Sequence, residues 1–142
     1  ALVETLGLNS HVIFTGFRKD AAAMVKLMDV VVQATKIPEG LGISLIEAMA
    51  AGKAVIAAGG GGSDEVVEEG KTGLLIPQGD FRALSGAIIR LLSSDPLRKS
   101  MGEEGRRRAA EKFSIERTIS FIQQIYENIL NSFPLPERER VG

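Results

Sequence analysis

The sequence predicts an α/β protein with a Rossmann-like open parallel sheet flanked by helices. Four short runs without Asp, Glu, Lys or Arg alternate with stretches of helical periodicity. Runs that are apolar along their whole length are typical of parallel strands whose two faces are both covered. These predicted strands are residues 11–15, 30–34, 54–58 and 73–77.

The first elements in chain order are a helix end, a strand and a second helix. Residues 1–8 are predicted to end a helix at Gly7, and the strand at 11–15 is predicted to end at Gly16. Asp20 is the predicted N-cap of the next helix. His11 is interpreted as a strand-edge residue rather than a catalytic base.

Residues 38–52 form the stretch with the strongest functional pattern. Gly40 and Gly42 open an apolar helical segment that Gly52 ends, and Glu47 is its only charged side chain from residue 41 to 51. A helix that is apolar nearly all round is expected to be buried, so the Glu47 carboxylate would need hydrogen-bond donors. Glu39 precedes the helix at a sharp turn, beside amide N–H groups that attract phosphate. The stretch therefore predicts a site for phosphate and for sugar hydroxyls.

The second half is predicted to contain a glycine run and four helices. The run Gly59–Gly62 follows a strand, and residues 63–69 are predicted to form a short helix. Asp80 is predicted to cap a helix with one apolar stripe, and Asp95-Pro96 to cap and begin the next helix. The charged residues 96–112 are interpreted as an ordinary solvated face, including the run Arg106-Arg107-Arg108.

Ser114 is predicted to cap a last helix with an apolar stripe. The stripe consists of Ile115, Ile119, Ile122, Tyr126 and Ile129, and we expect it to be part of the core. The tail 133–142, which alternates Glu and Arg after two prolines, is predicted to be loose.

The length of 142 residues corresponds to about one domain, which we place at residues 1–132. Four strands are fewer than the six or so of a doubly wound sheet, and the sequence begins within a helix. We therefore expect that a preceding strand–helix–strand segment is missing. A sheet cut in this way exposes apolar edges, which predicts weak folding or self-association.

The composition excludes several classes of function. A net charge of −1 gives no basic surface for nucleic acid. The absence of cysteine and the single histidine leave no common ligand set for a metal site. No apolar run reaches the ~20 residues that a membrane-spanning helix needs.

Several segments resemble the C-terminal, donor-binding half of retaining glycosyltransferases of family 4, which have the GT-B fold ("glycosyl transferases group 1"). The similarity covers residues 1 to about 130 at matching spacing. It rests on Phe14-Thr-Gly-Phe, Pro38-Glu-Gly-Leu-Gly, Glu47-Ala-Met-Ala-Ala-Gly-Lys-Ala-Val-Ile-Ala, Glu65-Val-Val, Gly70-Lys-Thr-Gly-Leu-Leu-Ile-Pro and Phe113-Ser-Ile-Glu-Arg.

The resemblance implies roles for individual residues. Glu39 is similar to the family's first acid, placed beside the donor sugar and its phosphate. Glu47 is similar to the second acid, which accepts hydrogen bonds from the ribose hydroxyls. The resemblance further implies that the donor is approached by the amides of Gly40, Leu41 and Gly42, by Ile43 and Ser44, and by the pair Gly61-Gly62.

The chain also departs from the family pattern. Gly59 stands where the family often has an acid, and Asp64 stands where it often has proline. The acceptor-binding N-terminal domain is absent, as is the region whose basic pair grips the diphosphate. We therefore expect the chain to be inactive by itself.

The implied function is transfer of a glycosyl group from a UDP-, GDP- or ADP-sugar to an acceptor hydroxyl, with retention of configuration and without a metal. The resemblance implies a cytoplasmic enzyme, which in its intact form could be peripheral to a membrane. Three alternatives remain: a non-catalytic nucleotide-sugar binding module, a truncated remnant, or another GT-B enzyme such as an epimerase or phosphorylase. At single residues, Glu39 could be an exposed turn residue, Glu47 a buried acid bound by protein amides, and Gly59–Gly62 a flexible loop.

Overall fold

The computed structural model describes residues 2–37 and 40–133, whose centre is a parallel sheet of three strands. The strands are β1 (Val30–Gln33), β2 (Ala54–Ala58) and β3 (Gly73–Ile76), in the order β1-β2-β3. In register, Val30 of β1 lies opposite Ala54, and Val55 of β2 lies opposite Gly73. All five residues of β2 are buried. The predicted fold class, a Rossmann-like α/β sheet flanked by helices, is confirmed.

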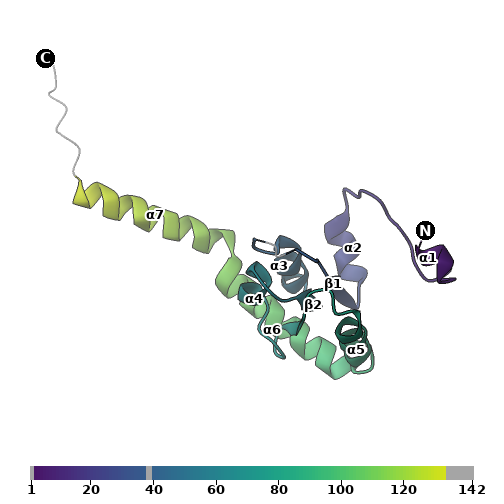
Figure 1. The fold of residues 1–142 in the computed structure, drawn as a ribbon. Helices are drawn as coiled ribbons and strands as arrows, with labels where there is room; N and C mark the ends of the chain where they lie inside the picture. The colour runs from purple at the N-terminus through teal and green to yellow at the C-terminus, as the bar shows by residue number, and fades with distance from the viewer. Residues whose placement is uncertain (1, 38–39, 134–142) are drawn as a thin grey trace, which may run out of the picture.

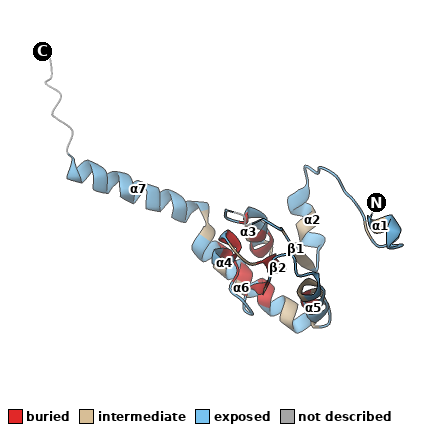
Figure 2. Cartoon of the chain, in the orientation of Figure 1, coloured by how far each residue is buried: buried red, intermediate tan, exposed pale blue. Residues whose placement is uncertain are grey.

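Helices cover both faces of this sheet (Figure 1). Helices α3 (Ile43–Ala50) and α4 (Gly62–Val66) share one core cluster with Val55 and Ala57 of β2. Helix α5 (Phe81–Leu92) shares the other cluster with Ala54 and Ile56. Alternate residues of a strand point to opposite faces, so the two clusters lie on opposite sides of the sheet. Figure 2 shows the buried residues gathered in β2 and the helices around it.

Helix α6 (Asp95–Phe113) joins the two sides of the sheet. Its Met101 packs in the α5 cluster, and its Ala109 packs in the α3 cluster. Between them, Gly102 lies against the backbone of Gly52, so close that a Cβ there would lie 2.9 Å from the Gly52 carbonyl carbon. The helix is therefore more than a solvated face, because one side of it is part of the core.

The arginine run on α6 is also only partly a solvated face. Arg107 is exposed and pairs with Glu104 and Glu111 on its own helix. The Arg108 guanidinium, in contrast, donates from Nε to the Val66 carbonyl oxygen over 2.9 Å and is partly buried. Arg108 thus fixes α6 to the end of α4.

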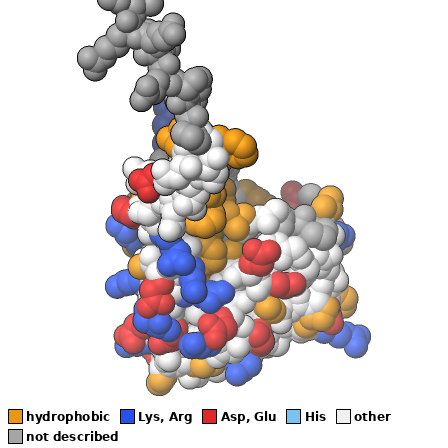
Figure 3. Space-filling view, turned by 90° about the vertical axis from the view of Figure 1, so that its left-hand side faces the viewer, with side chains coloured by type: hydrophobic (Ala, Val, Ile, Leu, Met, Phe, Trp, Pro, Cys, Tyr) orange, Lys and Arg blue, Asp and Glu red, His pale blue; other side chains and the backbone are white. Residues whose placement is uncertain are grey.

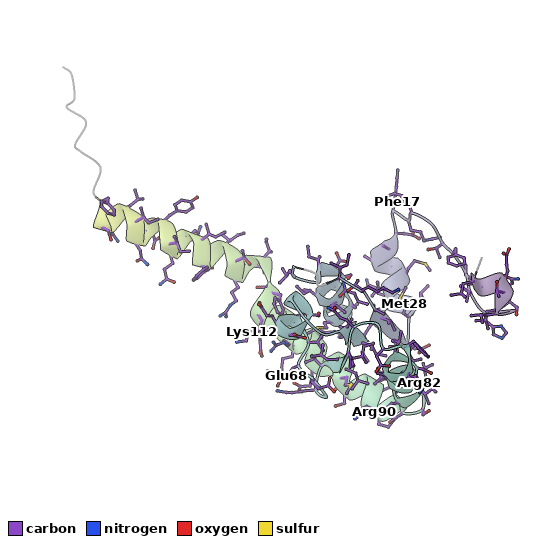
Figure 4. All side chains as sticks on the ribbon, in the orientation of Figure 1. Phe17, Met28, Glu68, Arg82, Arg90 and Lys112 are labelled. Carbon is purple, nitrogen blue, oxygen red and sulfur yellow. The ribbon has the colours of Figure 1, made fainter. Side chains whose placement is uncertain are left out.

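The predicted strand at 11–15 is wrong. The segment is exposed and unpaired, and it lies between α1 (Leu2–Thr5) and α2 (Ala21–Leu27), away from the sheet (Figure 1). A strand is stabilised by hydrogen bonds to a neighbouring strand, and none of the three strands pairs with residues 11–15. Phe17, just after this segment, is 91% exposed and points away from the body (Figure 4).

The prediction that the last helical stripe belongs to the core is also wrong. Helix α7 (Ile115–Ser132) leaves the body after α6, and none of its residues is buried (Figures 1 and 2). Its amphipathic pattern produced the prediction, but the pattern shows only that one face is apolar and not what covers it. Figure 3, which looks at the end of this helix, shows hydrophobic side chains exposed where it leaves the body. Phe133 at its end is exposed, and the rest of the predicted tail lies outside the described residues.

The predicted helix caps are confirmed at two positions and corrected at two. The Asp80 carboxylate accepts from the amides of Arg82 and Ala83, and Ser114 caps α7. Asp20 stands at the N-cap position of α2, but its carboxylate binds Arg18, which lowers the Asp20 pKa. Ser94, one residue before Asp95, caps α6.

Candidate functional site

The candidate site lies at the edge where the three parallel strands end. The segments that follow β1, β2 and β3 all leave the sheet at this edge and lead into α3, α4 and α5. In open α/β sheets this edge is where ligands bind. The predicted stretch around residue 40 and the glycine run 59–62 are thereby brought to one side of the molecule.

Gly42 forms the turn that begins α3. It has φ +67°, which favours glycine, and its carbonyl accepts the first helical hydrogen bonds from Leu45 and Ile46. A Cβ at Gly42 would lie 3.2 Å from Leu45 Cδ1, so the turn is also tightly packed. The first amides of a helix point out of its end, so α3 directs N–H groups and the exposed Ile43 and Ser44 to the edge.

Gly62 joins the glycine run to the turn at residues 40–42. The Gly40 carbonyl and the Leu41 backbone press against Gly62 so closely that a Cβ there would lie 2.6 Å from Leu41 Cα. Only glycine fits this contact. The structure therefore brings the turn at residues 40–42 and the pair Gly61-Gly62 together, while their role in donor binding stays a prediction.

Glu47 is exposed, which corrects the expectation of a buried acid. Helix α3 buries Leu45, Ala48 and Met49 on one face, and Glu47 lies on the opposite face. Ser44 is three residues earlier and Ile43 four, so all three share that outer face. The alternative interpretation, a buried carboxylate bound by protein amides, is wrong for the same reason.

Glu39 and His11 are the two other residues considered from the sequence. Glu39 and Pro38 lie outside the described residues, so the role assigned to Glu39 stays a prediction. His11 is exposed in the segment outside the sheet, with its Nδ1 3.0 Å from the Ser10 hydroxyl.

The structure adds residues at this edge that sequence reasoning missed. A cavity of about 170 Å³ opens between the strand ends and α5. The Gln78 amide nitrogen leans over Gly60, 3.0 Å from where a Cβ would stand. Lys36 and Gln78 follow soon after the ends of β1 and β3, and this position in the sequence could have indicated both residues. The cavity is lined by Ala34, Lys36, Ala58, Ile76, Gly79, Asp80, Phe81 and Leu84.

Within residues 2–37 and 40–133, no three His, Asp or Glu side chains come together as metal ligands. In the same part of the chain, no helix combines the length and apolar character needed to cross a bilayer.

The sheet and its flanking helices define a Rossmann-like α/β fold, with a glycine-lined candidate site where the strands end. The family model for Glycosyl transferases group 1 matches residues 1–108, and the chain belongs to this family.

Relatives from the family are similar over nearly the whole chain. EpsD of Bacillus subtilis, named as a glycosyltransferase, is 39% identical over 88% of this chain and 32% of its own length. The N-acetyl-alpha-D-glucosaminyl L-malate synthase of Bacillus anthracis is 33% identical over 91% of the chain and 34% of its own length. The chain thus spans about one third of these relatives.

Solved GT-B glycosyltransferases share the fold. Sucrose-phosphate synthase of Thermosynechococcus elongatus superposes with a TM-score of 0.86 and 32% identity, over 92% of this chain and 33% of that one. HepE of Anabaena, solved in complex with UDP-glucose, has a TM-score of 0.81 and 30% identity, over 91% of this chain and 35% of its own.

Proposed function

We propose that this chain is the donor-binding half of a retaining glycosyltransferase of family 4. The intact enzyme would transfer a glycosyl group from a nucleoside-diphosphate sugar to an acceptor hydroxyl. The main support is the contact of Gly62 with the Gly40–Leu41 backbone, which joins two glycine turns beside the start of α3. A relative of similar fold that was solved with UDP-glucose adds support for this class of ligand.

Each part of the edge receives a role in this proposal. The amides of Gly40, Leu41 and Gly42 and the start of α3 face the diphosphate, with Ile43 and Ser44 lining the same place. Glu47 accepts hydrogen bonds from the ribose hydroxyls, for which its exposure is required. Glu39 would lie beside the donor sugar.

The chemistry follows from where charge develops. As the anomeric bond breaks, negative charge grows on the phosphate oxygens of the leaving diphosphate. Preorganised amides stabilise that charge more in the transition state than in the ground state. We propose that the chain alone binds a donor without transferring it, because the acceptor domain and the family's basic pair would come from the rest of the enzyme.

Titration with UDP, GDP and ADP tests the proposed function. We expect wild type to bind at least one of them. Glu47→Ala should weaken that binding roughly tenfold or more, because hydrogen bonds to a charged group contribute about 1.5–3 kcal/mol. Glu103→Ala, which removes an exposed glutamate on α6, should leave affinity unchanged. Absence of binding in wild type, or equal affinity in Glu47→Ala, would refute the proposal.

We also propose that the isolated chain self-associates through its exposed apolar side chains. Ile13 and Phe14 are 86% and 82% exposed, and the α7 stripe is exposed as well. Sedimentation velocity is expected to show species larger than the monomer. Phe14→Gln and Ile122→Gln, made separately, identify which surface is responsible. A single monomeric species with cooperative unfolding would contradict this expectation.

A further inference from the structure

The Gly59–Gly62 loop has a backbone conformation that favours glycine and that needs contacts with the rest of the chain to stay ordered. Gly60 and Gly61 have φ values of +95° and +85°. Glycines lose more conformational freedom on folding than other residues, so such a loop needs tethers to stay in one conformation. Its shape matters to the site because Gly62 presses on Gly40 and Leu41.

Three groups tether this loop. The Gly59 amide donates to the Ile76 carbonyl oxygen over 2.8 Å, and the buried Ser63 hydroxyl donates to the Ala58 carbonyl oxygen over 2.7 Å. Both hold the ends of the loop. The Asp64 carboxylate holds its middle, because its two oxygens accept from the Gly60 amide at 2.9 and 3.1 Å.

The glycine at residue 59 leaves room for the Asp64 carboxylate beside it. A Cβ at Gly59 would lie 3.2 Å from Asp64 Oδ1, tighter than ordinary van der Waals contact. A side chain at residue 59 would therefore crowd the carboxylate. The two departures from the family pattern, at 59 and 64, are thus physically connected in this chain.

We propose that Asp64 is a positioning residue that holds the Gly59–Gly62 loop against the Gly40–Leu41 backbone and thereby fixes the amides of the phosphate side of the site. The carboxylate acts through Gly60 and does not touch the ligand. This inference rests on the proposed function for its meaning in donor binding, whereas the mechanical coupling of the two turns can be tested without any ligand.

Amide hydrogen exchange of the full chain tests the coupling. Asp64→Ala is expected to accelerate exchange about fivefold or more at Gly59 and Gly60, and also at Leu45 and Ile46, whose amides donate to the Gly42 carbonyl oxygen. Asp64→Asn keeps an acceptor for the Gly60 amide and should restore most of the protection. Glu65→Ala, the exposed neighbour on α4, is the control and should change neither segment. Acceleration confined to Gly59 and Gly60, or Asn behaving like Ala, would overturn the proposal.

A second variant covers the case in which Asp64→Ala does not fold. Gly59→Ala inserts a methyl group against the carboxylate and should accelerate exchange in the same two segments. Slower or unchanged exchange at Leu45 and Ile46 in the Gly59→Ala variant would overturn the proposal.

Ligand binding tests the functional meaning. Asp64→Ala is expected to weaken UDP binding about fivefold through lost preorganisation and to leave uridine binding unchanged. Tighter UDP binding would show that the carboxylate competes with phosphate and would overturn the proposal. If wild type binds neither compound, the proposed function fails, and hydrogen exchange still decides whether Asp64 couples the two turns.

Discussion

Gly62→Ala is expected to abolish most of the nucleotide affinity of the chain. The new methyl group would overlap the Gly40 carbonyl and lie 2.6 Å from Leu41 Cα, and both neighbours are backbone atoms that cannot rotate away. The turn must therefore shift, which moves the amides that face the diphosphate. We expect UDP affinity to fall more than tenfold and the free energy of unfolding to fall by about 1–3 kcal/mol.

Comparison with Gly40→Ala separates the two effects. No heavy atom lies within 4 Å of a Cβ placed at Gly40, so this variant should fold with the stability of wild type. Because Gly40 lies at the proposed ligand edge, the added methyl group should reduce affinity only. Chemical denaturation and calorimetric titration give the two quantities. A Gly62→Ala variant with wild-type stability and affinity would contradict the contact.

Gly102→Ala is expected to cause the largest loss of stability among the glycine substitutions. Its Cβ would overlap the Gly52 carbonyl, where α6 crosses the edge of the sheet at the end of α3. Separating the two backbones exposes Met101 and Ala109, which are buried in the two core clusters. We expect the free energy of unfolding to fall by about 3 kcal/mol, at the upper end for overpacking.

Gly86→Ala is the matched control. Gly86 also lies within a helix, but nothing stands within 4 Å of its Cβ position. Replacing it should raise the free energy of unfolding by about 0.5–1 kcal/mol, since alanine favours the helix. Urea denaturation of both variants measures the difference. Equal effects of the two substitutions would show that the contact of α6 with Gly52 is not close.

The strands and the core were predictable wherever a pattern is set by local burial. Runs such as Val30–Gln33 and Ala54–Ala58 are apolar on both faces, and this property is visible without knowing their neighbours. The strand at 11–15 was wrong because strand pairing depends on a partner, which a run of residues does not reveal. The apolar stripe of α7 failed for the same reason, because amphipathicity shows a face but not its cover.

In the candidate site, the glycine turns were predictable and the environment of Glu47 was not. Gly42 has a positive φ, and Gly62 lies against the backbone of Gly40 and Leu41. Other residues fit these two positions poorly, so the glycines indicated the turns in the sequence. Ile43 and Ala50 are apolar and yet exposed, so the apolar composition of α3 concealed which face is buried. Leu45 and Met49 define the inner face, and Glu47 lies opposite them. Lys36 and Gln78 were missed because they belong to no recognised motif.

In the proposed site, the turn at residues 40–42 and the start of α3 receive the diphosphate, while Glu47 holds the ribose. The most direct measurement is the amide NMR spectrum of the full chain during titration with UDP and, separately, with uridine. UDP is predicted to shift the amides of Gly40, Gly42, Ile43 and Ser44, and uridine is predicted to leave these amides unmoved while still shifting Glu47. UDP-induced shifts confined to other parts of the chain would contradict the assignment of the site.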